Sequence, residues 1–231
     1  PLVIIGMIGI YSNINSMYKS AMGNLEHNVV MFKEKAQNVL LSVHLDIQLM
    51  CDSPIFRQYL KDVDDNRVQG TSELLTEQLL TFAKMKKIYY QLHFCDRYGD
   101  ERFLIRNRDS DFIISWNPMS QRSYRHYFIL TESLQKGQIS FAPNELRGDN
   151  FRRIPVISFA NRIYDQKGDF AGIFVVDVFA KDFFNILKEI SYLGPVGKIA
   201  IISQEGFYVY HSEKKKNWNR LLAYRDSENL F

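Results

Sequence analysis

Motifs for catalysis or for metal binding are missing from this chain of 231 residues. It contains no Gly-x-Ser-x-Gly turn, no His-Glu-x-x-His helix and no glycine-rich phosphate loop. None of the five histidines stands at metal-ligand spacing from another histidine, a cysteine or a carboxylate. They are His27, His44, His93, His126 and His211. We therefore predict that this segment is not an enzyme and holds neither a metal nor a cofactor.

Cysteine and excess charge are scarce as well. Cys51 and Cys95 lack the Cys-x-x-Cys spacing of a redox or zinc site, which leaves one disulfide or, as we expect, two free buried thiols. The net charge of +3 is too small to indicate a nucleic-acid partner. The basic stretch EKKKNWNR, residues 213–220, could touch phosphates, but a solvated loop is the simpler interpretation. A composition of 46% hydrophobic and 24% charged residues is typical of a globular protein.

The chain opens with a short uncharged run, PLVIIGMIGIY, at residues 1–11. This run cannot cross a membrane by itself, because a spanning helix needs about 20 apolar residues. Since it leads directly into a long helical pattern, we interpret residues 1–13 as the outer end of a membrane anchor. The core of a signal peptide or an ordinary buried helix would have the same composition.

A helical pattern of unusual length follows this run. Apolar residues recur every three or four positions from Ile14 to Met50, with no proline and only Gly23 as an interruption. Pro54 disfavours helical backbone at the residue before it, so we predict one helix over residues 14–52. About 40 residues at about 1.5 Å each give about 60 Å, which suits a stalk that carries a domain away from a membrane. The same apolar stripe could form the seam of a coiled-coil dimer, and the two roles are compatible.

The rest of the chain combines antiparallel strand pairs with helices, which indicates an α+β fold. Five strands are expected to form one antiparallel sheet: KIYYQLHFC, ERFLIRN, GQISFAP, RRIPVISFANRIY and FAGIFVVDVFA. We interpret RDSDFIISWNP as a polar loop and expect a short helix near SQRSYRHYFILTESLQ. A last hairpin, GKIAIISQEGFYVYHS, has no further strands to join, and two strands alone are marginally stable. We therefore predict a second domain that begins near Gly197 and is cut short.

One carboxylate, Asp177, interrupts the apolar strand FAGIFVVDVFA. Burying it is costly unless it is paired or hydrogen-bonded. If DQKG forms a four-residue hairpin loop, Asp177 lies opposite Val156, on the sheet face that carries the small residues Ser158 and Ala160. Small neighbours leave room for a ligand. The alternative is an ion pair within the chain, for which the candidate partners are Arg125, Arg153 and Arg106.

Five stretches carry a resemblance when they are taken in order. They are QLMCDSPIFRQYLKD, YYQLHFCDRYGDERFLIRN, RHYF followed by LQKGQISFAPNEL, IPVISFANRIYDQKGDFAGIFVVDVFAKDFF and GKIAIISQEGFYVYHSEKKKNW. This series resembles the double Cache sensor domains, the PAS-like extracytoplasmic modules of bacterial transmembrane receptors. The resemblance implies a five-stranded antiparallel sheet flanked by helices. It also implies a stalk helix at 14–52, a membrane-distal module at 53–190 and the start of a truncated membrane-proximal module at 191–231.

The resemblance also implies a ligand site. In amino-acid-sensing relatives, an Arg, a Trp and a Tyr near the pocket helix bind the ligand carboxylate, and a downstream Asp binds its amine. Arg125, Tyr127, Phe128 and Asp177 stand at these positions, so the Trp and the Tyr are replaced and an α-amino acid is not implied. Arg125 is suited to hold a carboxylate, and Asp177 a cation or a hydroxyl. Three further residues could line the site, although each aromatic could equally be core: Tyr90, Tyr124 and Ser158.

These expectations define a function. We expect a small-molecule-sensing domain on the periplasmic or extracellular side of the inner membrane, in a receptor whose output is a histidine kinase or a diguanylate cyclase rather than a chemoreceptor. The ligand would be a carboxylate or an amine, and the receptor a homodimer joined through the long helix. The alternative is an ectodomain that binds no small molecule and docks a protein partner, because the RHYF motif departs from the family pattern.

Overall fold

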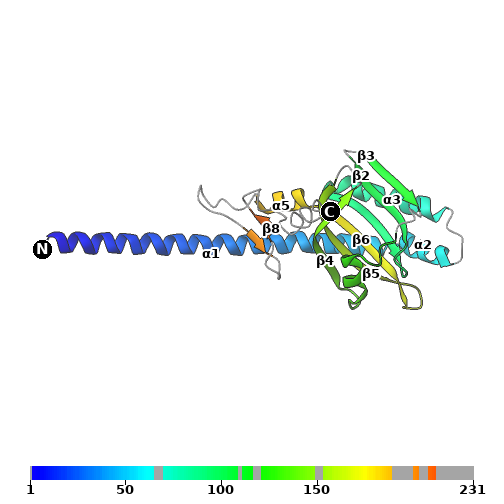
Figure 1. Cartoon of the computed structure of the whole chain (residues 1–231), viewed down its shortest axis with the longest axis horizontal. Coiled ribbons are helices and arrows are strands. Elements are labelled where there is room, and N and C mark those ends of the chain that lie inside the picture. The colour runs from blue at the N-terminus through cyan, green and yellow to red at the C-terminus, as the bar shows by residue number, and fades with distance from the viewer. Residues whose placement is uncertain are drawn as a thin grey trace, which may run out of the picture.

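The structure, a computed structural model, is a long helix that projects from an antiparallel sheet (Figure 1). It describes residues 2–64, 70–108, 111–116, 121–148, 153–188, 200–202 and 208–211. The α+β class is confirmed.

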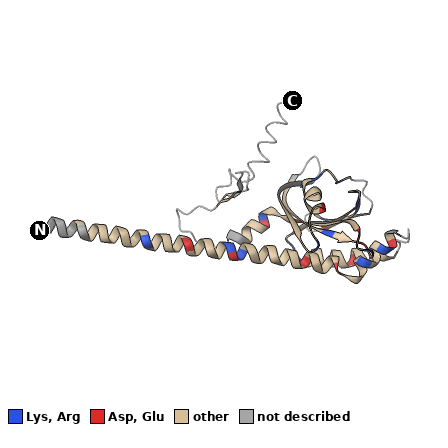
Figure 2. Cartoon of the chain, turned by 90° about the horizontal axis from the view of Figure 1, so that it is seen from below, with Lys and Arg blue, Asp and Glu red and all other residues tan. Residues whose placement is uncertain are grey.

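Helix α1 runs from Leu2 to Cys51 without a break, so the run at residues 1–11 and the helix expected at 14–52 belong to one element. Charged side chains are sparse along its first half (Figure 2). Its apolar residues are buried at one end of the helix and exposed at the other. Near the end of the helix Val43, Ile47 and Met50 are buried against the sheet, whereas Ile14 and Leu25 on the free part are exposed.

No single helix in the described ranges is both long enough and apolar enough to cross a membrane. The helices α1 and α2 meet that criterion only when they are counted together across a bend of 54°.

A sharp corner joins α1 to α2, which spans Pro54–Asp64. Pro54 suits the first position of a helix because its missing N–H would be unpaired there in any case. The hydroxyl of Ser53 accepts a hydrogen bond from the backbone N–H of Phe56 at 3.2 Å and so caps the helix. Phe56 and Tyr59 of α2 are buried, and α3, which spans Thr71–Met85, adds Leu75 and Leu79 to the same core.

The sheet contains six antiparallel strands in the order β3-β2-β1-β6-β5-β4. The strands are β1 (Tyr89–Asp96), β2 (Glu101–Arg108), β3 (Asp111–Trp116), β4 (Ile139–Gly148), β5 (Arg153–Tyr164) and β6 (Phe170–Phe179). The expectation of five strands is wrong because the stretch interpreted as a polar loop contains β3. This strand lies at the edge of the sheet, where Phe112 and Trp116 pack on the core while Ile113 and Ile114 are partly exposed.

The two faces of the sheet carry different clusters of buried residues and pack against different helices. One face carries the main core, which includes Phe94, Phe103, Phe174 and Val176 and packs against α1, α2 and α3. The other face carries a smaller cluster that includes Cys95, Ala160 and Val175 and packs against α4. Helix α4 spans His126–Glu132, within the stretch where a short helix was expected.

The register of β5 with β6 differs from our prediction. Asp177 lies opposite Ser158, and Val156 lies opposite Phe179. The predicted pairing of Asp177 with Val156 is therefore wrong by two residues. One residue arises at the turn, where Tyr164 pairs with Phe170 rather than Asp169, and the other at the irregularity between Ile163 and Tyr164. A shift of two residues keeps every side chain on its face, so the predicted common face of Asp177 and Ser158 is confirmed.

A helix and a pair of short strands follow the sheet within the described residues. Helix α5, Ala180–Lys188, packs its buried Phe183 and Phe184 into the core beside α1. Strands β7 (Ala200–Ile202) and β8 (Tyr208–His211) form the expected antiparallel pair, in a separate two-stranded sheet. The rest of the proposed second module lies outside the described residues, and the division into modules stays a prediction.

Candidate ligand-binding site

Polar side chains gather on the sheet face that α4 covers. Strand alternation places Gln91, His93 and Cys95 of β1 on this face together with Asp177 of β6. Their neighbours are Glu101 of β2, Ser158 of β5, Arg147 of β4 and Tyr127 of α4. All eight side chains are buried. We call this set the α4 cluster: Gln91, His93, Cys95, Glu101, Tyr127, Arg147, Ser158 and Asp177.

Asp177 is paired within the chain. Arg147 donates from Nε to one carboxylate oxygen at 2.7 Å and from Nη2 to the other at 3.3 Å. Ser158 donates its hydroxyl to the carboxylate at 2.5 Å. The fork of an arginine matches a carboxylate in this way, and such charge-assisted bonds are stronger than neutral ones. The pair therefore compensates the cost of burying both charges.

The partner of Asp177 is not one that the sequence indicated. Arg106 is bound to Gln91, its Nε donating to the amide oxygen at 3.0 Å. Arg125 forms no ion pair within the described residues, and the side chain of Arg153 lies outside them. Arg147 was missed because the strand GQISFAP was expected to end at Pro143, whereas β4 continues to Gly148.

A second charged group lies beside the first. His93 Nδ1 is 2.9 Å from Glu101 Oε1, and Arg122 donates to the other Glu101 oxygen at 3.2 Å. His93 Nε2 faces Asp177 at 3.9 Å, too far for a hydrogen bond. Burial by itself would raise the pKa of Glu101, but its hydrogen bond and charge contact with His93, together with Arg122, outweigh burial and lower this pKa to about 2. Glu101 is therefore a carboxylate at neutral pH.

Tyr127 places a phenol at the centre of the α4 cluster. The Arg147 guanidinium lies 4.5 Å above its ring, and the His93 ring meets it edge-on at 5.8 Å. Burial raises the pKa of the phenol, so it stays protonated. Its hydroxyl has no hydrogen-bond partner in the described part of the chain, although it is fully buried. A buried polar atom left in this way indicates a missing partner.

The other site residues inferred from the resemblance lie around this centre. Phe128 is buried in the small apolar cluster beside Phe170, which is the position of a core residue. Arg125 is the residue before α4, half-buried, with an Nε that has no hydrogen-bond partner among the described residues. Tyr124 is 64% exposed and lies under the Arg125 guanidinium, outside the cluster.

Tyr90 lies at the edge of the α4 cluster rather than at its centre. It lies at an irregularity in the pairing of β1 with β6, between Tyr89 and Gln91. Its buried ring meets Phe179 at 5.2 Å and lies below the Arg106 guanidinium at 6.0 Å.

Sequence reasoning also missed His93 and Glu101. A usable signal was present, because Gln91, His93 and Cys95 alternate with apolar residues along β1 and so share one face. Within the described ranges, no three His, Cys, Asp or Glu side chains are arranged to hold a metal ion.

The charges of the site define what it can bind. Leaving His93 aside, three arginines (Arg122, Arg125 and Arg147) stand against two carboxylates, Glu101 and Asp177. Both carboxylates already have arginine partners. Among the described residues Arg125 has no ion pair and the Tyr127 hydroxyl no hydrogen-bond partner, so both groups are suited to an anionic group with hydrogen-bond acceptors.

Comparisons with known proteins agree with this fold. The extracellular domain of the histidine kinase candidate vpHK1S-Z8 superposes with a TM-score of 0.70 at 20% identity, over 91% of this chain and 77% of that one. A domain of a sensory box/GGDEF family protein candidate from Vibrio parahaemolyticus gives a TM-score of 0.68 at 20% identity, over 86% and 74%. The ligand-binding domain of the Campylobacter jejuni chemoreceptor Tlp3, in complex with L-valine, gives 0.61 at 13% identity, over 87% and 75%.

These neighbours are sensor domains, and at such identities they show the fold alone. No curated protein matches the sequence. The family model of the bacterial histidine kinase sensor domain matches residues 31–231, which is most of the chain. The resemblance to extracytoplasmic sensor domains is therefore confirmed, and this chain belongs to the bacterial histidine kinase sensor domain family.

Proposed function

We propose that the module at residues 53–190 senses a small carboxylate, which binds between α4 and the sheet. The observation that carries this proposal is the pair of unsatisfied polar groups at one end of α4. Arg125 has a positive charge and no ion pair within the described residues, and Tyr127 has a buried hydroxyl that lacks a partner there. A carboxylate would supply acceptors to both groups.

The pairing of Asp177 narrows the class of ligand. In this structure Arg147 and Ser158 already occupy both oxygens of Asp177. A ligand amine would have to displace Arg147 before it could bind there. Displacing one partner of a buried ion pair costs several kcal/mol, so we propose that the ligand needs no α-amino group. The neighbouring chemoreceptor structure contains L-valine, which makes valine a useful probe.

A matched pair of ligands tests this proposal by isothermal titration calorimetry. L-Valine and 3-methylbutanoate differ only in the α-amino group. We expect 3-methylbutanoate, or another compound in a panel of short carboxylates, to bind at least as tightly as its amino analogue. Arg125→Ala should weaken this binding at least about tenfold, since a hydrogen bond to a charged group contributes about 1.5–3 kcal/mol.

Two further variants make the test specific. Tyr127→Phe should weaken binding without lowering the melting temperature, because the lost hydroxyl has no partner in the described part of the chain. Arg108→Ala, at the exposed end of β2, removes the same charge as Arg125→Ala and should leave binding unchanged. Binding that survives both Arg125→Ala and Tyr127→Phe would place the ligand elsewhere.

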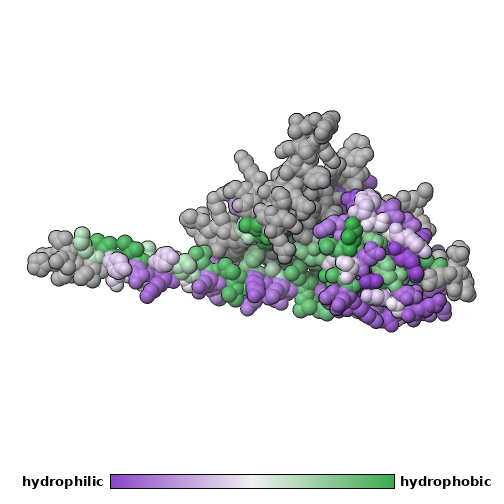
Figure 3. Space-filling model, turned by 60° about the horizontal axis from the view of Figure 1, so that its bottom comes forward, coloured by the Kyte–Doolittle hydropathy of each residue, from purple (hydrophilic) through white to green (hydrophobic). Residues whose placement is uncertain are grey.

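We also propose the setting in which this module works. The family and the neighbour described as an extracellular domain support a position outside the cytoplasm. The apolar start of α1 supports membrane attachment at that end. The family match supports a histidine kinase as the output domain, and the exposed apolar residues of α1 support a homodimer (Figure 3).

A second function has one observation in its favour. The ion pair between Arg147 and Asp177 is also what a site without any ligand would contain, and Phe128 is core rather than pocket wall. Under this alternative the module docks a protein partner on its surface. The calorimetric panel separates the two functions, because a docking module binds none of the carboxylates.

A further inference from the structure

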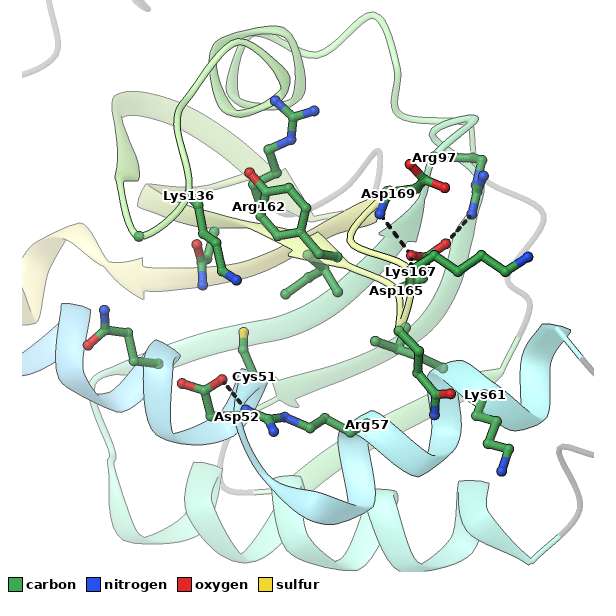
Figure 4. A pocket seen from close by; sticks show the side chains of 17 residues that line it. Cys51, Asp52, Arg57, Lys61, Arg97, Lys136, Arg162, Asp165, Lys167 and Asp169 are labelled. Carbon is green, nitrogen blue, oxygen red and sulfur yellow. Dashed lines mark hydrogen bonds and ion pairs between the residues drawn. The ribbon is translucent and has the colours of Figure 1, made fainter.

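A second concavity lies at the end of the sheet where the β5–β6 hairpin turns, away from the residues of the α4 cluster. It is a pocket of about 1000 Å³ between the corner of α1 and α2, the loop before β4 and the β5–β6 hairpin (Figure 4). Its lining includes Cys51 and Asp52 at the end of α1 and Tyr164 on β5. It shares none of its lining residues with the α4 cluster.

The walls of this pocket are strongly basic. Six cationic side chains line it: Arg57, Lys61, Arg97, Lys136, Arg162 and Lys167. Only three carboxylates accompany them: Asp52, Asp165 and Asp169. The excess of three positive charges equals the net charge of the whole chain. A concave surface with charge of one sign concentrates counter-ions of the opposite sign.

Two of these carboxylates are already occupied. Asp52 accepts a hydrogen bond from Arg57 at 2.9 Å. Asp165 accepts hydrogen bonds from the backbone N–H groups of Asp169 and Lys167 and lies 3.6 Å from Arg97. These contacts, with the Asp169 N–H foremost, lower the pKa of Asp165, so it remains charged and paired.

The three lysines of the pocket are exposed, and the charge of Lys167 contributes to the lowered pKa of Asp165. Neither Lys61 nor Lys167 makes an ion pair with any residue that the structure describes, and Lys136 contacts only the face of the Tyr164 ring, at 5.7 Å. Figure 4 shows Lys136 extending from the sheet side toward the two helices. The three lysines come from α2, from the loop before β4 and from the hairpin. Figure 4 shows Lys61 and Lys167 across the pocket from Lys136 and extending outward, so both side chains must turn inward to share one anion with Lys136.

We infer that this pocket is a second ligand site, which binds a small anion with at least two negative charges through Lys61, Lys136 and Lys167. The shared chemistry is that of clustered carboxylates or phosphate oxygens, which accept hydrogen bonds from ammonium groups. An anion held there joins α2 and the loop before β4 to the β5–β6 hairpin. The strand β6 of that hairpin carries Asp177, so the two sites share a structural element.

Calorimetry with citrate and with pyrophosphate tests this site and separates carboxylate from phosphate ligands. The background is Arg125→Ala, which weakens the proposed site beneath α4 and so reduces its contribution to the measured binding. We expect at least one of the two anions to bind, with an affinity that falls between low salt and about 0.15 M salt, because exposed charges are screened. Removing all three lysines by Lys61→Gln, Lys136→Gln and Lys167→Gln should weaken this binding at least about tenfold.

A charge-matched control distinguishes binding in this pocket from non-specific attraction of the anion to a positively charged protein. Lys19→Gln, Lys33→Gln and Lys84→Gln together remove the same charge from exposed positions outside the pocket and should leave the affinity within about twofold. All six lysines are exposed, so both triple variants are expected to fold. The inference is overturned if neither anion binds, if the pocket variant binds as well as its parent, or if the control loses as much affinity as the pocket variant.

Discussion

At the scale of single residues, the buried carboxylate of Asp177 is neutralised by Arg147, which comes from the edge strand β4. Asp177 is completely buried, and Arg147 reaches it from β4, on the far side of β5. Arg147 in turn lies on the Tyr127 ring and donates to Ser158 at 3.3 Å. Asp177, Arg147 and Tyr127 are therefore linked by direct contacts.

These contacts predict a strong energetic coupling. Arg147→Met leaves Asp177 buried without its counter-charge and should lower the free energy of unfolding by about 3–5 kcal/mol. Adding Asp177→Asn removes the unpaired charge and should recover a large part of that loss. Urea unfolding of the four proteins in this cycle measures the coupling.

The cycle has an internal comparison. Arg102 pairs with Asp96, whose carboxylate also accepts hydrogen bonds from the backbone N–H groups of Tyr98 and Asp100. The Arg102 side chain is 37% exposed, so Arg102→Met should cost less than Arg147→Met. If the losses from Arg147→Met and Asp177→Asn simply add in the double variant, the two residues do not act as a unit.

The residue scale also shows what sequence reasoning can reach. The face of Asp177 was predicted correctly although its register was wrong, because a slip of two residues preserves alternation. Its partner could not be found, because Pro143 was taken as the end of a strand. Edge strands tolerate proline, and β4 is an edge strand with an irregular register between Ala142 and Glu145. The strand therefore continues past Pro143, and Arg147 near its end contacts Asp177.

At the scale of elements, α1 has two different faces along its last three turns. Ile47 is completely buried against the sheet, whereas Leu45, two residues earlier, is 54% exposed. Leu41 and Leu49 share the exposed side because residues four apart lie on one face of a helix. Periodicity predicted the helix well, yet it did not separate the stripe that packs inward from the leucines that face outward.

This contrast predicts unequal costs for similar truncations. Ile47→Ala should lower the free energy of unfolding by about 2–5 kcal/mol, because it leaves a cavity between α1 and the sheet. Leu45→Ala should change it by no more than about 0.5 kcal/mol, because the side chain is on the surface. Urea unfolding with a common m-value measures both, and equal losses would show that α1 is not docked as described.

The missed strand β3 makes a related point about elements. Its run of Phe112, Ile113 and Ile114 has the residues of a strand, but charged residues precede it and obscured the pattern. Being an edge strand, β3 has one neighbour, β2, and its two isoleucines stay partly exposed. Short edge strands of this kind give a weak sequence signal because only part of the strand is buried.

At the scale of the whole molecule, the outward leucines of α1 have no partner among the described residues of one copy. Leu41, Leu45 and Leu49 are between 54% and 67% exposed. Two copies related by a two-fold axis along α1 would cover these residues and bring both N-termini to the same end, as attachment to one membrane requires. A ligand-induced change in the module of one copy would then reach the contact between the α1 helices of the two copies.

The dimer predicts the effect of one charge on assembly. Leu45→Glu places a carboxylate in the proposed contact, where burying it unpaired is costly, and should raise the dimer dissociation constant at least about tenfold. Because Leu45 is exposed in the single chain, the unfolding curve of the dissociated protein should stay the same. Gln166→Glu at the exposed tip of the β5–β6 hairpin adds the same charge away from α1 and should leave the dimer intact. Sedimentation velocity over a concentration series measures all three proteins. A native chain that sediments as a monomer throughout, or a Leu45→Glu chain that dimerises as the native chain does, would show that the leucines of α1 do not join two copies.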